Sequence, residues 1–282
     1  MSSIHQPSEY QSFSHDGWKG QVASELQKPL EQFQGDWPDE FLNDSSFKKI
    51  SLAHRTGILV FRGMIGGYDS YLKHFEHRKT GKNNRDNLWQ NIRWRFGSSR
   101  ALHNHRINLK LIELGFGAAK PLLAARKTDG FKAEDIFISQ AVEGQPLQIT
   151  LQETDPETHT KLLIQAGQTI ARLHNNNFIH GDLLPYNILL SPDHSSLTFL
   201  DNDRTQHYPF GKQTHQKNRN IQQMLYRLLS LFTWHTIKPF TDTYYKESNL
   251  TPSQGRTQLT YALKQVRKRQ AKNKTKRFER NV

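Results

Sequence analysis

The chain has 282 residues and 35% hydrophobic content, which is enough to bury a sizeable core as one large domain or as two lobes. It contains no cysteine, so a disulfide framework and a thiolate metal site are excluded. The first residues carry neither the basic nor the apolar segment of a secretory signal, and no run approaches the ~18 apolar residues of a membrane span. We therefore expect a globular, cytoplasmic protein.

The formal net charge is +13, so a partner drawn by long-range attraction is expected to be anionic. Two segments hold much of this charge. Residues 77–106 carry eight Lys and Arg against one Asp, with Trp89, Trp94 and Phe96 among them, and this suits a solvated helix face, a membrane surface or a nucleic-acid groove. Residues 264–280 carry nine against one Glu, and there a solvated helix face with a frayed end is favoured.

Predicted strands dominate the first part of the chain. Residues 1–45 are polar and turn-rich and predict a loosely packed lead-in. Within Leu52–Phe75, the runs ILVF and YLKHF are β-type, and the glycine-rich GMIGGYD between them predicts a hairpin. Ser98–Leu114 has apolar residues at helical spacing and is closed by Gly115. Residues 46–141 are accordingly predicted to form an N-terminal lobe.

The next elements surround the most informative motifs. A strand is predicted to run into a loop around Ile136–Leu147. Thr158–Asn175 predicts a helix, because its apolar residues share one face. Short strands are predicted after it at FIH, NILL and LTFL, separated by turns.

The last part of the chain is helical in pattern. Helices are predicted from Asn218 onward, with Pro252 and Gly255 interrupting them before a basic tail at residues 263–282. Strands first and helices later predict the α+β class with two lobes, the second spanning residues 142–262.

Three polar residues in FIHGDLLPYNILL and FLDNDRT have a spacing that indicates a functional site. Asp182 and Asn187 flank a tight loop between two short strands, and Asp201 follows the strand LTFL. An amide oxygen and a carboxylate at one end of a hairpin could share a hard divalent ion such as Mg²⁺. Asp182 could then accept a hydroxyl proton, as phosphoryl transfer requires. The alternative is that these are ordinary turn residues, but their order and their setting favour the kinase interpretation.

At these residues the chain resembles the protein-kinase-like superfamily, in which HxDxxxxN forms the catalytic loop and a later Asp-containing element binds metal. HGDLLPYNILL with FLDNDRT resembles more particularly the lipopolysaccharide kinase family, bacterial enzymes that phosphorylate Kdo or heptose in the inner core. The resemblance runs from about Leu52 to about Leu231. It implies a two-lobed protein-kinase-like fold with a small, mainly β N-lobe and a larger, mainly α C-lobe, and ATP and Mg²⁺ as cofactors.

The resemblance assigns roles to particular residues. Asp182 matches the catalytic base, and Asn187 and Asp201 match the Mg²⁺ ligands. Lys73 in YLKHF matches the strand lysine that holds the α- and β-phosphates of ATP. An exposed lysine is common on a strand, and its place upstream of a helix is what favours this role.

Other residues are implied as accessory. Gln140 and Ala141 belong to the segment that links the lobes, where adenine meets backbone groups. His180 is expected to pack behind the catalytic loop. Asp203 and Arg204 either organise the metal loop or bind substrate.

The chain departs from the protein-kinase pattern in three places. The helix after the lysine strand has no carboxylate at its middle, where His103, Asn104, His105 and Asn108 stand instead of the glutamate that would pair with Lys73. The loop between the first strands holds only Gly57, so a glycine-rich phosphate cover is lacking. No Ala-Pro-Glu segment follows Asp201, which argues against a protein substrate.

Three functions are compatible with these features. The first is an ATP-dependent sugar kinase acting on an anionic partner, the lipopolysaccharide core or another phosphorylated saccharide, with peripheral contact at the inner face of the cell membrane and no specific nucleic acid. The second is a small-molecule kinase of the aminoglycoside or choline type, or a small atypical Ser/Thr kinase. The third is a non-catalytic basic pseudokinase, against which the retention of Lys73, Asp182, Asn187 and Asp201 together argues.

Overall fold

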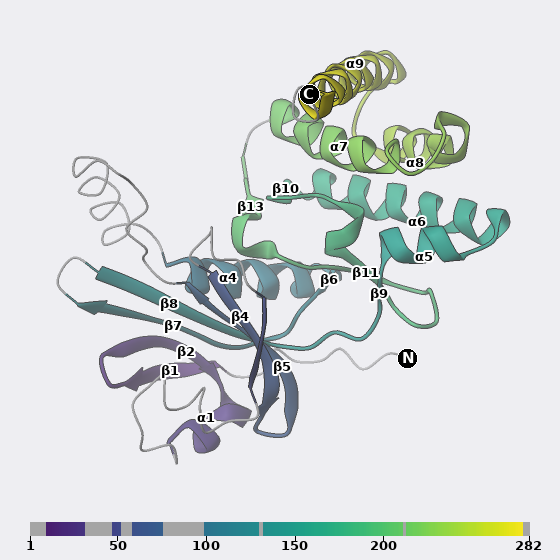
Figure 1. The fold of residues 1–282 in the computed structure, drawn as a ribbon. Helices are drawn as coiled ribbons and strands as arrows, with labels where there is room; N and C mark the ends of the chain where they lie inside the picture. The colour runs from purple at the N-terminus through teal and green to yellow at the C-terminus, as the bar shows by residue number, and fades with distance from the viewer. Residues whose placement is uncertain are drawn as a thin grey trace. The chain divides into compact units, whose positions relative to one another are not determined.

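The computed structural model describes residues 10–31, 47–51, 58–75, 99–129, 132–210 and 213–278. The chain divides into two compact units, Met1–Val142 and Glu143–Val282. The first is built on an antiparallel sheet and the second is mainly helical (Figure 1). This confirms the predicted α+β class.

The sheet of the first unit has the strand order β1-β2-β7-β8-β5-β4-β3 in the part of the chain that is described. Its strands are β1 (Tyr10–His15), β2 (Trp18–Ala23), β3 (Lys48–Ser51), β4 (Ile58–Ile65), β5 (Tyr68–Phe75), β7 (Pro121–Asp129) and β8 (Lys132–Gln140). The short strand β6 (Gly117–Ala118) also belongs to this unit.

The predicted hairpin is confirmed in β4 and β5. Their two-residue connection is Gly66 and Gly67, whose φ angles are 55° and 83°. Positive φ at both central residues is what a tight turn needs to match the twist of the strands, and glycine adopts it without steric cost. The loop that precedes β4, with Gly57, lies outside the described residues, as do residues 77–98 of the first basic segment.

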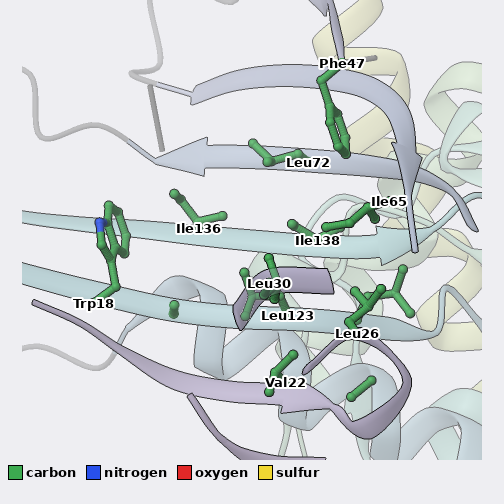
Figure 2. Close-up of a cluster of buried hydrophobic side chains, with 13 residues drawn as sticks. Trp18, Val22, Leu26, Leu30, Phe47, Ile65, Leu72, Leu123, Ile136 and Ile138 are labelled. Atoms are coloured by element: carbon green, nitrogen blue, oxygen red, sulfur yellow. The ribbon is translucent and has the colours of Figure 1, made fainter. Parts of the chain in front are cut away.

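Residues 10–31 correct the prediction of a loosely packed lead-in. They form β1, β2 and the helix α1 (Ser24–Glu31), and β2 pairs with β7 inside the sheet. Trp18, Val22 and Leu26 are almost fully buried in the largest cluster of this unit (Figure 2). Their apolar side chains are sparse in a polar segment, so only packing against the sheet reveals their contribution to the core. The strand β7 likewise had no counterpart in the prediction.

The helix α4 (Arg100–Glu113) confirms the prediction at Ser98–Leu114 and packs against β7 and β8. Its N-cap Ser99 accepts a hydrogen bond from the Leu102 backbone N–H at 3.1 Å and donates one to Asp135 at 2.7 Å. The Asp135 carboxylate also accepts from the Arg100 backbone N–H at 2.9 Å. A buried strand carboxylate thus anchors the N-terminus of this helix, where negative charge is favourable.

The second unit contains the helices α5 (Leu147–Glu153), α6 (Pro156–Asn175), α7 (Thr214–Leu228), α8 (Trp234–Glu247) and α9 (Pro252–Phe278). Its short elements are β9 (Gln145–Pro146), β10 (Phe178–Ile179), η1 (Pro185–Asn187), β11 (Ile188–Leu190), β12 (Leu197–Phe199), η2 (Asn202–Arg204) and β13 (Gln206–His207). The predicted apolar face of α6 is buried, and Asp155 caps its N-terminus by accepting from the Glu157 and Thr158 N–H groups.

The end of the chain differs from its prediction. Pro252 opens the helix α9, Gly255 lies within that helix, and the helix continues through the basic tail to Phe278. Proline fits the first turn of a helix because the N–H that it lacks has no partner there. Ala262 and Val266 are buried, which holds the middle of α9 against the unit. In the part of the chain that is described, no helix has the length and apolar character needed to span a bilayer.

Candidate active site

The glycine of the HGD motif lies where two loops approach closely. The strand β10 pairs antiparallel with β13, with Ile179 opposite Gln206, and this brings Gly181 against η2. A Cβ atom at Gly181 would lie 2.2 Å from Cβ of Arg204 and 2.7 Å from its carbonyl carbon. Only glycine fits at this distance, so the packing of the two loops accounts for this motif position.

The hairpin of β11 and β12 brings the two predicted metal ligands to one end. Ile188 pairs with Phe199, and the Leu200 N–H donates to the Asn187 carbonyl at 2.9 Å. Asp201 is the next residue after this pair. The arrangement expected from the spacing of NILL and LTFL is therefore present in the structure.

His180 joins the two loops through both ring nitrogens. Its Nε2 lies 2.9 Å from the Leu200 carbonyl oxygen, and its Nδ1 lies 3.1 Å from the Asp182 backbone nitrogen. Because a carbonyl accepts and a backbone N–H donates, Nε2 carries the proton and Nδ1 is the acceptor. Burial lowers the pKa of His180, against the opposing effect of the Leu200 carbonyl and the neighbouring carboxylates. A neutral imidazole therefore packs behind the loop.

The backbone of Asp182 is fixed by its neighbours in the loop. Its carbonyl oxygen accepts from the Leu184 N–H and from the Asn187 Nδ2 group, each at 2.9 Å. The second bond also orients the Asn187 amide, because it commits Nδ2 and leaves Oδ1 as the atom that could ligate a metal. One carboxylate oxygen of Asp182, Oδ1, accepts from Gln223 Nε2 at 3.1 Å.

Asp201 has a left-handed backbone conformation, with φ 58° and ψ 46°. This region is unfavourable for most residues, though Asp tolerates it better than others, and such conformations persist where the surroundings fix them. Here the buried Asn202 does so: its Nδ2 donates to the Phe199 carbonyl at 2.9 Å and its Oδ1 accepts from Thr205 Oγ1 at 3.1 Å. The result is an exposed Asp201 carboxylate on a rigid backbone.

The donor set fits magnesium. Asn187 and Asp201 offer an amide oxygen and a carboxylate, and Mg²⁺ prefers oxygen ligands while taking others from phosphate and water. Among the described residues, no group of three or more His, Cys, Asp and Glu could hold a metal by itself. Asn187 and Asp201 would thus supply two of the oxygen ligands of Mg²⁺, and phosphate and water would supply the others.

The two accessory residues of η2 differ in exposure. Asp203 is buried, which favours a part in organising the loop. Arg204 is exposed.

In the first unit, Lys73 lies in the middle of β5, opposite Val60 and Phe137 on the neighbouring strands. Residues two apart on a strand share a face, so Lys73 shares the face of Phe75, which packs with Ala101 of α4. Lys73 therefore lies on the α4 side of the sheet.

On the side that faces this part of the sheet, the helix α4 carries amide side chains and no glutamate. Asn104 and Asn108 are buried, and Asn108 Nδ2 donates to the Ala119 carbonyl at 3.1 Å. Asn104 Oδ1 is one of the few buried polar atoms of the described residues for which no hydrogen bond is found. Glu113, the carboxylate of this helix, is exposed at its end.

Gln140 and Ala141 close the sheet before the second unit begins. The Gln140 N–H donates to the Lys120 carbonyl at 2.9 Å, and the Ala141 N–H donates to the Asp69 carbonyl at 2.8 Å. These two donors are committed to the sheet. An adenine ring at this segment would therefore meet carbonyl groups of these residues and not their N–H groups.

Sequence reasoning missed the contribution of α7. Its buried Asn220 accepts from the His180 N–H at 3.0 Å and donates to the His180 carbonyl at 2.7 Å, which holds the backbone on both sides of His180. The signal was a pair of amides, Asn220 and Gln223, one turn apart beside the apolar stripe of Ile221, Met224 and Leu225. Nothing in the helical pattern says which loop these amides reach.

Comparison with known proteins agrees with the fold and with the family that the sequence resembles. Residues 53–244, more than half of the chain, match the model of the lipopolysaccharide kinase (Kdo/WaaP) family. Among solved structures, WaaP in complex with acyl carrier protein is similar, with a TM-score of 0.59 at 17% identity over 86% of this chain and 97% of that chain. The bifunctional kinase-methyltransferase WbdD matches at 17% identity with a TM-score of 0.45, over 78% of this chain and 50% of that chain. No curated protein matches the sequence.

Proposed function

Because this chain belongs to the lipopolysaccharide kinase (Kdo/WaaP) family, we propose that it transfers the γ-phosphate of ATP to a sugar hydroxyl, of Kdo or heptose, in the inner core of lipopolysaccharide. The observation that carries the proposal is the way His180 ties the loop of Asp182 and Asn187 to the loop of Asp201. Phosphoryl transfer needs little covalent help from the protein. It depends on groups held in place around the phosphate and the nucleophile.

In this proposal Asp182 is the base. As the acceptor hydroxyl oxygen bonds to the γ-phosphorus, its proton passes to the Asp182 carboxylate and ADP leaves with the electrons of the broken P–O bond. Oδ1 of Asp182 already accepts from Gln223, so Oδ2 is the atom assigned to the proton. Asn187 and Asp201 would hold a magnesium ion, which neutralises phosphate charge when it is bound.

Residues of the first unit would bind the nucleotide. Lys73 is assigned to the α- and β-phosphates, and its position on the α4 side of β5 supports this. Gln140 and Ala141 are assigned to adenine through their carbonyl groups. Asn104 is our candidate for the place that a glutamate holds in protein kinases, because its buried Oδ1 could accept from a lysine.

Two observations favour a saccharide acceptor over a protein. Only residues 205–213 separate η2 from α7, so there is no long segment after Asp201 that could carry a peptide platform. The net charge of +13 favours a phosphorylated saccharide over a cationic aminoglycoside, because electrostatic complementarity selects against like charge.

The basic helix α9 supports peripheral contact with the inner face of the cell membrane. Its residues Pro252–Phe278 include no Asp or Glu, and the side chains of Lys264, Arg267, Lys268 and Lys272 are exposed. Each Lys or Arg near an anionic leaflet contributes about 1 kcal/mol of attraction. Such contact would bring the enzyme to an acceptor that is itself anchored in lipid.

The test is transfer of labelled γ-phosphate from ATP to purified core oligosaccharide, beside aminoglycosides, choline and a generic protein. Asp182→Ala serves as the blank. Label in the core alone supports the proposal. Label in another acceptor would contradict the sugar acceptor but support phosphoryl transfer from ATP. A wild-type protein that neither binds Mg·ATP nor transfers label would support the pseudokinase interpretation instead.

A further inference from the structure

A chain of side-chain hydrogen bonds runs from the interior of the second unit to the carboxylate of Asp182. The Tyr244 hydroxyl lies 2.7 Å from His174 Nδ1, and His174 Nε2 lies 3.1 Å from Asn220 Oδ1. Asn220 Nδ2 donates to Gln223 Oε1 at 3.2 Å. Gln223 Nε2 then donates to Asp182 Oδ1 at 3.1 Å.

The direction of every bond in this chain is determined. Asn220 Oδ1 can only accept, so His174 Nε2 carries the proton and His174 Nδ1 must accept from the Tyr244 hydroxyl. Burial, the main cause, lowers the pKa of His174 to about 3, so the ring is neutral at ordinary pH. Asn220 has its oxygen committed to His174 and to the His180 N–H, which leaves its Nδ2 group to face Gln223. The Gln223 amide is thereby oriented with its N–H toward Asp182.

The burial of the chain makes these orientations costly to reverse. His174 and Asn220 are almost fully buried, and Tyr244 is buried on α8. A flipped Asn220 amide would place its Nδ2 group against the His174 and His180 N–H donors and its oxygen against the His180 carbonyl. Unsatisfied buried donors and acceptors of this kind are strongly disfavoured.

We infer that Gln223 is a positioning residue for the base: its N–H fixes Asp182 Oδ1 and so presents Oδ2 to the acceptor hydroxyl, in an orientation set by Asn220, His174 and Tyr244. This inference rests on the proposed function, because it gives Asp182 the role of base. It adds a residue that lies on α7, outside the motifs of the catalytic loop and the metal loop. Gln223 does not touch the reacting atoms and acts through Asp182.

The variant Gln223→Met removes the donor while keeping nearly the same length and volume. Gln222→Met, one residue earlier and also half-buried on α7, is the matched control. We expect Gln223→Met to lower kcat by about tenfold to 100-fold, the range for a misplaced catalytic group. KM for ATP and the melting temperature should stay near wild type, since the nucleotide ligands are untouched. Tyr244→Phe removes the first donor of this series of hydrogen bonds and should also lower kcat, but by less than Gln223→Met.

A second measurement does not need turnover. The side-chain amide resonance of Gln223 in a ¹⁵N–¹H spectrum, identified by its loss in Gln223→Met, should move in Asp182→Ala and in Tyr244→Phe but not in Gln222→Met.

The outcomes separate the inference from the proposed function. An active wild type with a Gln223→Met kcat within twofold of it would overturn the inference and leave the kinase intact. A Gln223 side-chain amide resonance that does not shift in Asp182→Ala would also overturn the inference. If the wild type transfers no phosphate to any acceptor, the proposed function fails, and a Gln223 resonance that responds to both variants still establishes the link from Tyr244 to Asp182.

Discussion

Replacing Gly181 by Ala should disable the site through packing alone. The added Cβ would lie 2.2 Å from Cβ of Arg204 and 2.8 Å from its carbonyl oxygen. Ordinary contact begins near 3.4 Å, so the two loops must separate by about 1.2 Å, the difference between 3.4 and 2.2 Å. Because Gly181 lies between His180 and Asp182, this separation acts directly on the bond that joins the loops.

The size of the effect follows from these distances. The bond from His180 Nε2 to the Leu200 carbonyl is 2.9 Å long, and a shift of this size would stretch it beyond hydrogen-bond range. Overpacking costs about 1–3 kcal/mol of folding stability, and a displacement near 1 Å costs about 100-fold in rate. We therefore expect kcat to fall by about 100-fold and the free energy of unfolding to fall by about 1–3 kcal/mol.

The assay compares Gly181→Ala with Gly255→Ala. A Cβ at Gly255, inside α9, meets its nearest atom at 3.5 Å and so fits. This control should keep wild-type kcat and gain up to about 1 kcal/mol of stability, since Ala is the better helix former. Phosphate transfer and urea unfolding are measured on both variants. Wild-type kcat and stability in Gly181→Ala would refute the reasoning from loop packing.

Three further predictions concern the base, the basic helix and acid stability. Asp182→Ala should abolish transfer with Mg·ATP affinity nearly intact, whereas Asp201→Ala should weaken that affinity, both measured by calorimetry and label transfer. Neutralising four exposed cations of α9 should reduce binding to anionic vesicles in sedimentation, more so at low salt; they are Lys264, Arg267, Lys268 and Lys272. Stability should fall by about 1.4 kcal/mol per pH unit for His174 alone as pH drops below about 6.5, measured by urea unfolding.

The sign of the last prediction follows from proton linkage. His174 has its pKa lowered to about 3 in the folded protein, against an ordinary value of 6.5. Between these values the unfolded chain binds more protons than the folded protein. The contribution of His174 to stability is therefore fully present above pH 6.5 and is lost as the pH falls toward 3. His174→Gln should flatten this dependence, and an unchanged slope would contradict it. If the α9 substitutions leave vesicle binding unchanged, the proposal that this helix contacts the membrane is wrong. If Asp182→Ala transfers phosphate at the wild-type rate, the assignment of Asp182 as the base is wrong.

Local patterns in the sequence predicted several elements correctly. The β-type runs on either side of the glycine-rich GMIGGYD predicted the hairpin of β4 and β5, because glycine adopts the positive φ that Gly66 and Gly67 have in the tight turn. The apolar residues of α6 recur at helical spacing from Leu162 to Leu173. Such elements are predictable because the interactions that define them lie a few residues apart.

Residues 10–31 and β7 were not predictable in this way. The strand β2 pairs with β7 about a hundred residues later, and its buried Trp18 and Val22 stand among polar neighbours. The pairing partner and not the local pattern made these residues part of the sheet. At the other end, Pro252 and Gly255 looked like breaks, yet the buried Ala262 and Val266 hold α9 together.

The sequence by itself determined the chemistry that we propose for this protein, because HGDLLPYN and LDNDR carry the proposed base, the amide and the carboxylates within 25 residues of one another. Tertiary structure alone decided how these groups are held. Asn220 and Gln223 reach His180 and Asp182 from a helix some forty residues away, and His174 and Tyr244 determine which way their amides face. An amide in a helical stripe has no preferred partner until folding buries it, and burial then forces every donor to find an acceptor.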